Sequence, residues 1–119
     1  MSKHVLLVDD DQGIREVLSI ILEENGYLAT SLSHATSIET MLLKVKPDLV
    51  IMDMWIAGED GCEVVKRIKD NPVFASIPVI IVSAENDGEV LAKKCGADGF
   101  ISKPFEMEEF LQKIQLFIS

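Results

Sequence analysis

Three consecutive aspartates, Asp9, Asp10 and Asp11, follow directly on the apolar run HVLLV at residues 4–8. Like charges this close together repel, and a crowded carboxylate tends to keep its proton. A divalent cation relieves such crowding, and Mg²⁺ suits these ligands because it binds one or two carboxylates, a carbonyl and several waters. The acidic run therefore predicts a metal site, or three carboxylates with separate tasks.

Polar side chains also end three further apolar runs of the chain. Asp53 closes LVIMD, Ser83 closes PVIIVS, and Lys103 follows GFIS. A lysine and a hydroxyl beside a metal-bound carboxylate can bind the free oxygens of a phosphoryl group. Together they would make a phosphoryl-transfer site, in which a carboxylate can act as the nucleophile and become an aspartyl phosphate.

Secondary structure must bring these side chains together, and the chain alternates between two hydrophobic patterns. Runs typical of buried strands lie at residues 4–8, 27–32, 48–53, 78–83 and 99–102. Apolar residues recur at helical spacing at residues 14–22, 38–45, 64–68, 90–95 and 107–118, the last stripe being the longest. This alternation predicts an α/β fold, with a parallel sheet covered by helices on both faces. Ligands bind such a sheet beyond the carboxyl ends of its strands, where the polar residues lie.

The composition restricts the class of protein further. With 119 residues, of which 48% are hydrophobic, the chain has the size of one domain, which we place at residues 1–119. A net charge of −9 argues against binding nucleic acid through its phosphates. No apolar run reaches the length of a membrane span, and no secretory signal pattern opens the sequence. A cytoplasmic protein without membrane contact is expected.

Cysteines and histidines give no sign of a zinc site or a catalytic triad. Cys62 and Cys95 lack metal-type spacing and are expected to be small buried hydrophobic side chains. His4 and His34 stand apart from other ligand-type residues, which argues against a zinc or triad enzyme.

The runs LLVDDD, LVIMD, IIVSA and FISKPF resemble the response-regulator receiver domains of two-component signalling. The resemblance covers nearly the whole chain, and its key positions fall at the strand ends that the alternation assigns. It implies a flavodoxin-like, doubly wound (βα)5 fold, with a five-stranded parallel sheet in the order 2-1-3-4-5.

The resemblance also implies a role for most of the acidic residues. Asp53 would be the phosphoacceptor, which takes a phosphoryl group from the phosphohistidine of a partner. Asp10 would bind Mg²⁺ (or Mn²⁺) directly and Asp9 would assist through water, with Asp53 and the backbone carbonyl of Trp55 as the other protein ligands. Asp11, from its position before a helical stripe, is expected to cap that helix and to meet the positive end of its dipole.

Two residues match the phosphoryl-binding positions of the family. Ser83 would hydrogen-bond the attached phosphoryl group, and Lys103 would pair with another of its oxygens. The resemblance also implies a cis peptide bond between Lys103 and Pro104, a geometry that proline makes less costly.

Signalling requires a two-state element whose balance the phosphoryl group shifts. In this family the hydroxyl residue, here Ser83, moves toward the phosphate, and an aromatic residue swings inward behind it. Phe100 holds that aromatic position, although it could also be a plain core side chain. The face formed by the helix at residues 90–95, the strand at 99–102 and the helix at 107–118 would then change and engage a partner.

The loop after Asp53 departs from the family pattern. Family members often have proline four residues after the phosphoacceptor, where this chain has Ala57, whereas Gly61 is in the expected place. Without the proline, the loop is expected to be less rigid.

Trp55 and Glu85 lie two residues after Asp53 and Ser83, respectively. We expect them to control the access of water to the phosphoryl group, because an apolar cover can exclude the attacking molecule. Trp55 could instead pack on the loop or anchor a partner, since tryptophan is enriched in interface hot spots.

A receiver domain would be a signalling phosphoacceptor rather than an enzyme, catalysing only its own phosphorylation and dephosphorylation. Its donor would be a sensor histidine kinase or a histidine phosphotransfer protein. Its output would be a downstream protein or an output domain outside this sequence, and it would act as a monomer or as a phosphorylation-dependent dimer.

Other functions fit the residues less well. A haloacid-dehalogenase-type phosphatase needs an aspartate where Trp55 stands, and a flavodoxin needs a Ser/Thr/Gly-rich loop in place of DDDQG. A receiver-like interaction module that is never phosphorylated would be expected to lack Asp53, Lys103 or the acidic pair, all of which are present.

Overall fold

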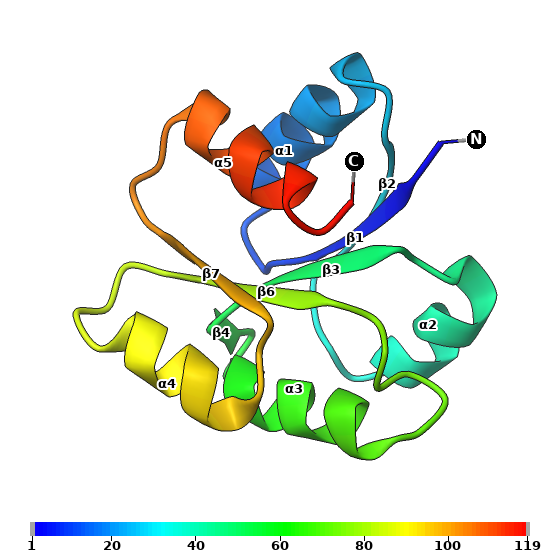
Figure 1. Ribbon diagram of the computed structural model, residues 1–119, viewed down its shortest axis with the longest axis vertical. Coiled ribbons are helices and arrows are strands. Elements are labelled where there is room, and N and C mark those ends of the chain that lie inside the picture. Colours follow the sequence, from blue (N-terminus) through cyan, green and yellow to red (C-terminus); the bar gives the residue numbers. More distant parts are fainter. Residues whose placement is uncertain (1, 119) are drawn as a thin grey trace.

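Five parallel strands form the central sheet of the computed structural model, which describes residues 2–118, in the order β2-β1-β3-β6-β7 (Figure 1). Their bounds are His4–Val8 (β1), Leu28–Leu32 (β2), Leu49–Asp53 (β3), Val79–Ser83 (β6) and Gly99–Ser102 (β7). Counting only these strands, the order is 2-1-3-4-5, so the predicted flavodoxin-like fold is confirmed.

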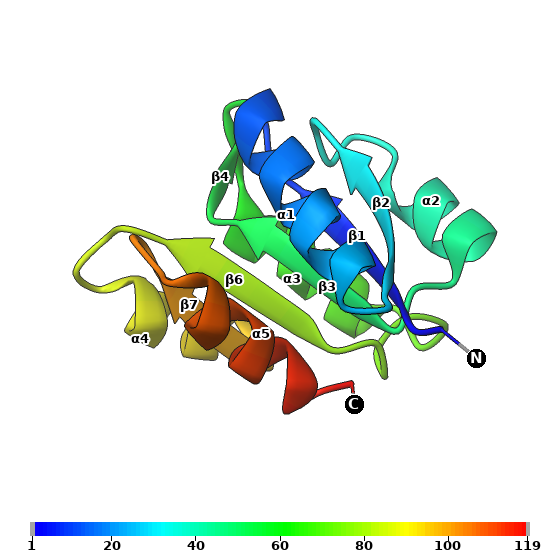
Figure 2. The same ribbon diagram turned by 90° about the horizontal axis from the view of Figure 1, so that it is seen from above.

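Five helices within residues 2–118 cover both faces of the sheet, as doubly wound folds require. They are α1 (Gln12–Glu24), α2 (Ile38–Val45), α3 (Gly61–Asp70), α4 (Gly88–Cys95) and α5 (Met107–Gln115). Helices α1 and α5 lie side by side over one face, and α2, α3 and α4 lie over the other (Figures 1 and 2). Within residues 2–118, no helix has the length and apolar character needed to cross a membrane.

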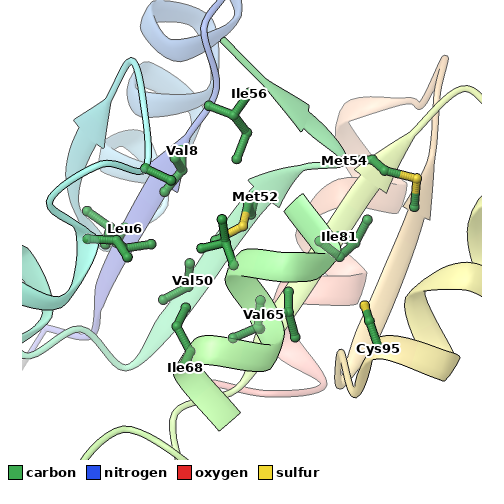
Figure 3. Close-up of a cluster of buried hydrophobic side chains, with 14 of the residues drawn as sticks. Leu6, Val8, Val50, Met52, Met54, Ile56, Val65, Ile68, Ile81 and Cys95 are labelled. Atoms are coloured by element: carbon green, nitrogen blue, oxygen red, sulfur yellow. The ribbon is translucent and has the colours of Figure 1, made fainter. Parts of the chain in front are cut away.

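Successive residues of the central strands supply two separate cores, one on each face. In β3, Val50 and Met52 are buried in the cluster beneath α2, α3 and α4, which Figure 3 shows, whereas Leu49 and Ile51 are buried beneath α1 and α5. A strand that buries both of its faces must be apolar at every position. The continuous apolar runs of the sequence therefore follow directly from the two-sided helical cover.

The last helix is shorter than the sequence predicts, because α5 ends at Gln115. The longest helix within residues 2–118 is instead α1, with 13 residues. The apolar spacing continues beyond the end of α5 since the chain still packs on the sheet there. Ile118 is buried, and the Phe117 ring packs close to Gly99. A Cβ on Gly99 would lie only 2.8 Å from a carbon of that ring. Helical spacing also overstates the burial of α1 and α4, because Val17 and Val90 are more than half exposed.

Two short strands, β4 (Trp55–Ile56) and β5 (Glu59–Asp60), form an antiparallel hairpin after β3. Its turn has positive φ at Ala57 (50°) and Gly58 (85°), the combination that a two-residue type I′ turn requires. The sequence pattern predicts only a loop here, so it misses this hairpin.

Helix α4 is held less firmly than α1. It has eight residues, and its N-cap residue Asp87 makes no side-chain hydrogen bond to the helix, whereas Asp11 caps the longer α1.

Both cysteines are free thiols, Cys95 buried and Cys62 partly buried. Burial, reinforced by the neighbouring Cys95 thiol, raises the pKa of Cys62 to about 12.

Candidate functional site

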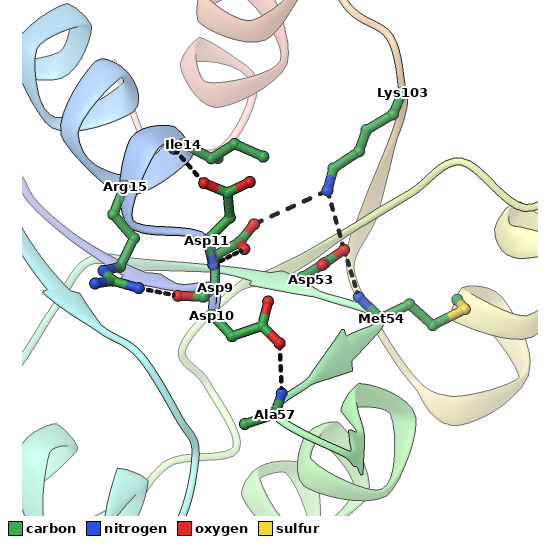
Figure 4. A network of polar contacts seen from close by, with 9 residues as sticks. All are labelled: Asp9, Asp10, Asp11, Ile14, Arg15, Asp53, Met54, Ala57 and Lys103. Atoms are coloured by element: carbon green, nitrogen blue, oxygen red, sulfur yellow. Dashed lines mark hydrogen bonds and ion pairs between the residues drawn. The ribbon is translucent and has the colours of Figure 1, made fainter.

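Three carboxylates meet at the carboxyl ends of β1 and β3. The two strands pair directly, with Val8 opposite Met52, so that Asp9 and Asp10 lie beside Asp53. One carboxylate oxygen from each of these aspartates lies within 4.8 Å of the other two (Figure 4). A set of converging hard oxygens of this size fits Mg²⁺ or Mn²⁺ better than softer metals.

Hydrogen bonds divide the three consecutive aspartates between different tasks. Asp9 is buried and accepts the Asp11 N–H at 2.9 Å, whereas the exposed Asp10 accepts the Ala57 N–H at 2.9 Å. Asp11 accepts the Ile14 N–H at 3.2 Å and is the N-cap of α1, as predicted. Only the first two carboxylates therefore face Asp53.

Lys103, which follows β7, brings a cation to the same place. Its Nζ lies 3.4 Å from an oxygen of Asp53 and 3.9 Å from an oxygen of Asp9. The Lys103–Pro104 peptide bond is cis, as the resemblance implies.

A residue that the sequence does not indicate, Arg15, donates from Nη1 to the backbone carbonyl of Asp9 at 2.7 Å. A contact to a backbone carbonyl leaves no motif by which sequence could reveal it.

The charges around Asp53 act in opposite directions. Burial raises the pKa of its carboxyl group above the ordinary value, the Lys103 ammonium opposes this rise, and the Asp9 carboxylate adds to it. The Met54 N–H and Lys103 both donate to the same Asp53 oxygen, at 3.0 and 3.4 Å. Asp53 is thus a carboxylate held in a crowded acidic site that one ammonium neutralises only in part.

Ser83 and Phe100 lie close together on the α4 side of the site. Ser83 ends β6, is buried, and accepts the Glu85 N–H at 3.0 Å through its hydroxyl oxygen. A Cβ on Gly88 would lie 3.0 Å from two carbons of the Phe100 ring and 3.2 Å from the Ser83 Cβ. The absence of a side chain at Gly88 therefore allows the first turn of α4 to touch both residues.

Trp55 and Glu85, which the sequence analysis pairs, are in direct contact. The indole Nε1 of Trp55 donates to Glu85 Oε1 at 3.0 Å, and the Trp55 side chain remains about half exposed. This bond joins the β4–β5 hairpin to the loop between β6 and α4.

An apolar groove that the sequence analysis does not predict opens beside Lys103. It runs between α1 and the segment that leads into α5, and its lining includes Ile14, Val17, Leu18, Pro104, Phe105 and Met107. Val17 and Met107 in this groove are more than half exposed. Their exposure leaves an uncovered apolar surface next to the acidic site.

The fold and this arrangement of polar strand ends are those of a phosphoacceptor signalling module. Residues 5–115 match the response regulator receiver domain family, and the chain belongs to that family. Phosphotransfer from a histidine kinase is the family's general function, and receiver domains use Mg²⁺ at an acidic pocket.

The chain is similar to transcriptional regulators and to a chemotaxis protein. It is 31% identical over 117 residues to the phosphate regulon transcriptional regulatory protein PhoB of Pseudomonas aeruginosa, which covers 97% of this chain and 51% of PhoB. It is 35% identical over 117 residues to the regulatory protein VirG of Agrobacterium tumefaciens, covering 96% of this chain and 43% of VirG.

The structure of the chemotaxis response regulator CheY4 of Vibrio cholerae superposes with a TM-score of 0.90 at 26% identity, covering 99% of this chain and all of CheY4 (100%). The chain thus spans about half the length of the curated relatives it matches, and the whole of a chemotaxis regulator.

Proposed function

We propose that this chain accepts a phosphoryl group on Asp53 from the phosphohistidine of a sensor histidine kinase or a histidine phosphotransfer protein. The observation that carries the proposal is the meeting of Asp9, Asp10, Asp53 and Lys103 at the carboxyl ends of neighbouring strands. Residues 1–119 would form one receiver domain, whose only catalysis is its own phosphorylation and dephosphorylation.

In the proposed reaction, an Asp53 carboxylate oxygen attacks the phosphorus atom while the bond from phosphorus to the histidine nitrogen breaks. The electron pair of that bond leaves with the nitrogen, and an acyl phosphate remains on Asp53. Lys103, already 3.4 Å from Asp53, would pair with a phosphoryl oxygen. Asp9, Asp10, Asp53 and the Trp55 carbonyl would hold Mg²⁺ (or Mn²⁺), which neutralises charge on the carboxylate and phosphoryl oxygens when bound.

The signal would leave the site through Ser83 and Phe100. A phosphoryl group on Asp53 would attract the Ser83 hydroxyl, which now accepts the Glu85 N–H. Gly88, where an added Cβ would lie 3.0 Å from the Phe100 ring and 3.2 Å from the Ser83 Cβ, lies close to both residues, so movement of the hydroxyl would change the packing of the ring and of the start of α4. The face formed by α4, β7 and α5 would then engage a downstream protein or an output domain, either in a monomer or in a dimer that depends on phosphorylation.

The phosphohistidine donor would dock in the apolar groove between α1 and the start of α5. This groove adjoins Lys103 and Pro104 and exposes Val17 and Met107. A donor that packs on this surface would place its histidine close to Asp53.

Incubation with Mg²⁺ and acetyl phosphate, followed by intact mass spectrometry, tests the proposal. The wild-type protein is expected to gain one phosphoryl group, because a small acyl phosphate needs only the site and no docking surface. Asp53→Asn, which keeps the shape of the side chain without its nucleophilic charge, is expected to gain none. An unmodified wild-type protein, or an adduct that persists in Asp53→Asn, would contradict the assignment.

Trp55 is proposed to shield the phosphoryl group from water, held in place by its hydrogen bond to Glu85. Trp55→Ala is expected to shorten the half-life of the phosphorylated protein severalfold, since the apolar cover is lost. The decay is followed by intact mass after removal of the phosphodonor.

Two variants serve as controls for the Trp55 prediction. Trp55→Phe keeps an aromatic cover without the N–H, and Glu85→Gln keeps an oxygen that can accept the N–H bond. Both are expected to decay more slowly than Trp55→Ala. A half-life in Trp55→Ala equal to that of the wild type would remove the shielding role.

A further inference from the structure

The tip of the β4–β5 hairpin reaches a carboxylate of the proposed metal site. The Ala57 N–H donates to Asp10 Oδ2 at 2.9 Å, although 47 residues separate the two along the chain. Figure 4 shows the bonded oxygen of Asp10 directed at Ala57 and the other oxygen directed toward Asp9 and Asp53. Within residues 2–118, this is the one hydrogen bond or ion pair that the Asp10 carboxylate makes.

The position of this N–H is fixed by the hairpin around it. Trp55 pairs with Asp60 and Ile56 pairs with Glu59, and the Ile56 side chain is fully buried. The Asp60 carboxylate accepts the Cys62 N–H at 2.9 Å, which ties the end of the hairpin to the start of α3. The N–H is therefore presented by a backbone that is anchored at its base.

The donor also depends on the residue type at position 57. Proline, which often stands at the corresponding position in the family, has no N–H and a φ fixed near −65°. Ala57 has φ of +50°, a value that proline cannot adopt. This chain can therefore form the hydrogen bond, whereas a receiver domain with proline at that position cannot.

We propose that the backbone N–H of Ala57 positions Asp10 for metal binding. An exposed aspartate otherwise samples several rotamers, and a single N–H bond to one oxygen holds the other oxygen toward the metal site. Loss of a hydrogen bond that orients a metal ligand commonly lowers the metal affinity by roughly ten- to a hundredfold. The inference rests on the Mg²⁺ site proposed above and assigns Ala57 a positioning role within it.

Mg²⁺ titration of the unphosphorylated protein tests the inference. Trp55 is the single tryptophan of the chain and belongs to the same hairpin, so its fluorescence should report binding. Mn²⁺ titration by electron paramagnetic resonance gives a second measurement that is independent of the tryptophan. Ala57→Pro is expected to bind Mg²⁺ about tenfold more weakly than the wild type, whereas Ala57→Gly, which keeps the N–H and accepts positive φ, is expected to match the wild type.

Replacement of Ala57 by lactate separates the N–H from the shape of the hairpin. This change turns the amide of residue 57 into an ester, which removes the donor and keeps the methyl side chain, and it is also expected to weaken Mg²⁺ binding. Wild-type affinity in the ester variant, or a loss in Ala57→Gly equal to that in Ala57→Pro, would overturn the positioning role. A wild-type protein that binds neither Mg²⁺ nor Mn²⁺ would instead overturn the metal site itself.

Discussion

Replacement of Gly61 by alanine is expected to lower the free energy of unfolding by about 3 kcal/mol. A Cβ at this position would lie 2.5 Å from the Asp53 carbonyl oxygen and 2.9 Å from the Met54 carbonyl oxygen. Both are backbone atoms, so no flexible side chain can move aside. The Gly61 N–H also donates to the Met54 carbonyl at 2.6 Å, and the backbone shift that relieves the clash would strain this bond. Urea unfolding followed by circular dichroism measures the loss.

The same substitution should also slow phosphorylation, because the backbone that must shift is that of Asp53, the proposed phosphoacceptor. Gly58→Ala provides a matched control, since a Cβ on Gly58 meets nothing within 4 Å and only the positive φ of 85° is strained. It is expected to cost about 1 kcal/mol, away from Asp53. If Gly61→Ala destabilised the protein no more than Gly58→Ala, the close approach of Gly61 to the β3 end would not be the reason for glycine there.

Asp53→Asn is expected to change stability in the opposite direction, raising the free energy of unfolding at pH 7 by on the order of 1 kcal/mol in the absence of metal. Burial and the nearby Asp9 carboxylate raise the pKa of Asp53, and Lys103 opposes them only in part. The charged form of Asp53 is thus disfavoured in the folded protein. Asparagine removes this charge and keeps an oxygen that can accept the Met54 N–H, which lies 3.0 Å from Asp53 Oδ1.

The stability gain of Asp53→Asn should depend on pH and on metal. The raised pKa means that the folded wild-type protein binds the Asp53 proton more tightly than the unfolded chain does. The destabilisation of the folded wild type by the ionised Asp53 is therefore fully present above the folded-state pKa. It disappears as the pH falls through that value toward the ordinary pKa of aspartate. Mg²⁺ should stabilise the wild type more than the variant and so reduce the difference.

Asp87→Asn controls for the change in net charge, since Asp87 is exposed and its side chain makes no cap bond. A gain in Asp53→Asn no larger than in Asp87→Asn, or one that grows as the pH falls, would contradict this account. Chemical denaturation at several pH values, with and without Mg²⁺, distinguishes these results.

The sequence predicts the sheet well because two-sided burial leaves a strong signal. Apolar runs such as VIIVS are long enough to identify their strands, and polar residues such as Asp53 mark where the runs end. The N-cap role of Asp11 is predictable for a similar reason, since a carboxylate just before a helical stripe has a known local use.

The β4–β5 hairpin is not predictable in the same way. Its strands have two residues each and no apolar alternation, and only Gly58 of its turn is a residue type that favours positive φ. The hydrogen bond from Ala57 to Asp10 is missed with it, because a backbone donor carries no side-chain signature. The spacing of Trp55 and Glu85 from Asp53 and Ser83 suggests a shared role for the two residues. The hydrogen bond between them could not be predicted from the sequence.

The weak anchoring of α4 has a consequence for how the molecule fluctuates. Helix α4 has eight residues, an N-terminus without a side-chain cap bond and an exposed Val90. It therefore loses fewer stabilising interactions when it unfolds than the longer, capped α1 does. Local unfolding next to Ser83 and Phe100 therefore requires less free energy than the opening of α1, and the amide hydrogens of α4 should exchange with solvent sooner than those of α1 and of the buried strands. The segment that is proposed to carry the signal is thus one that thermal motion opens more readily than α1.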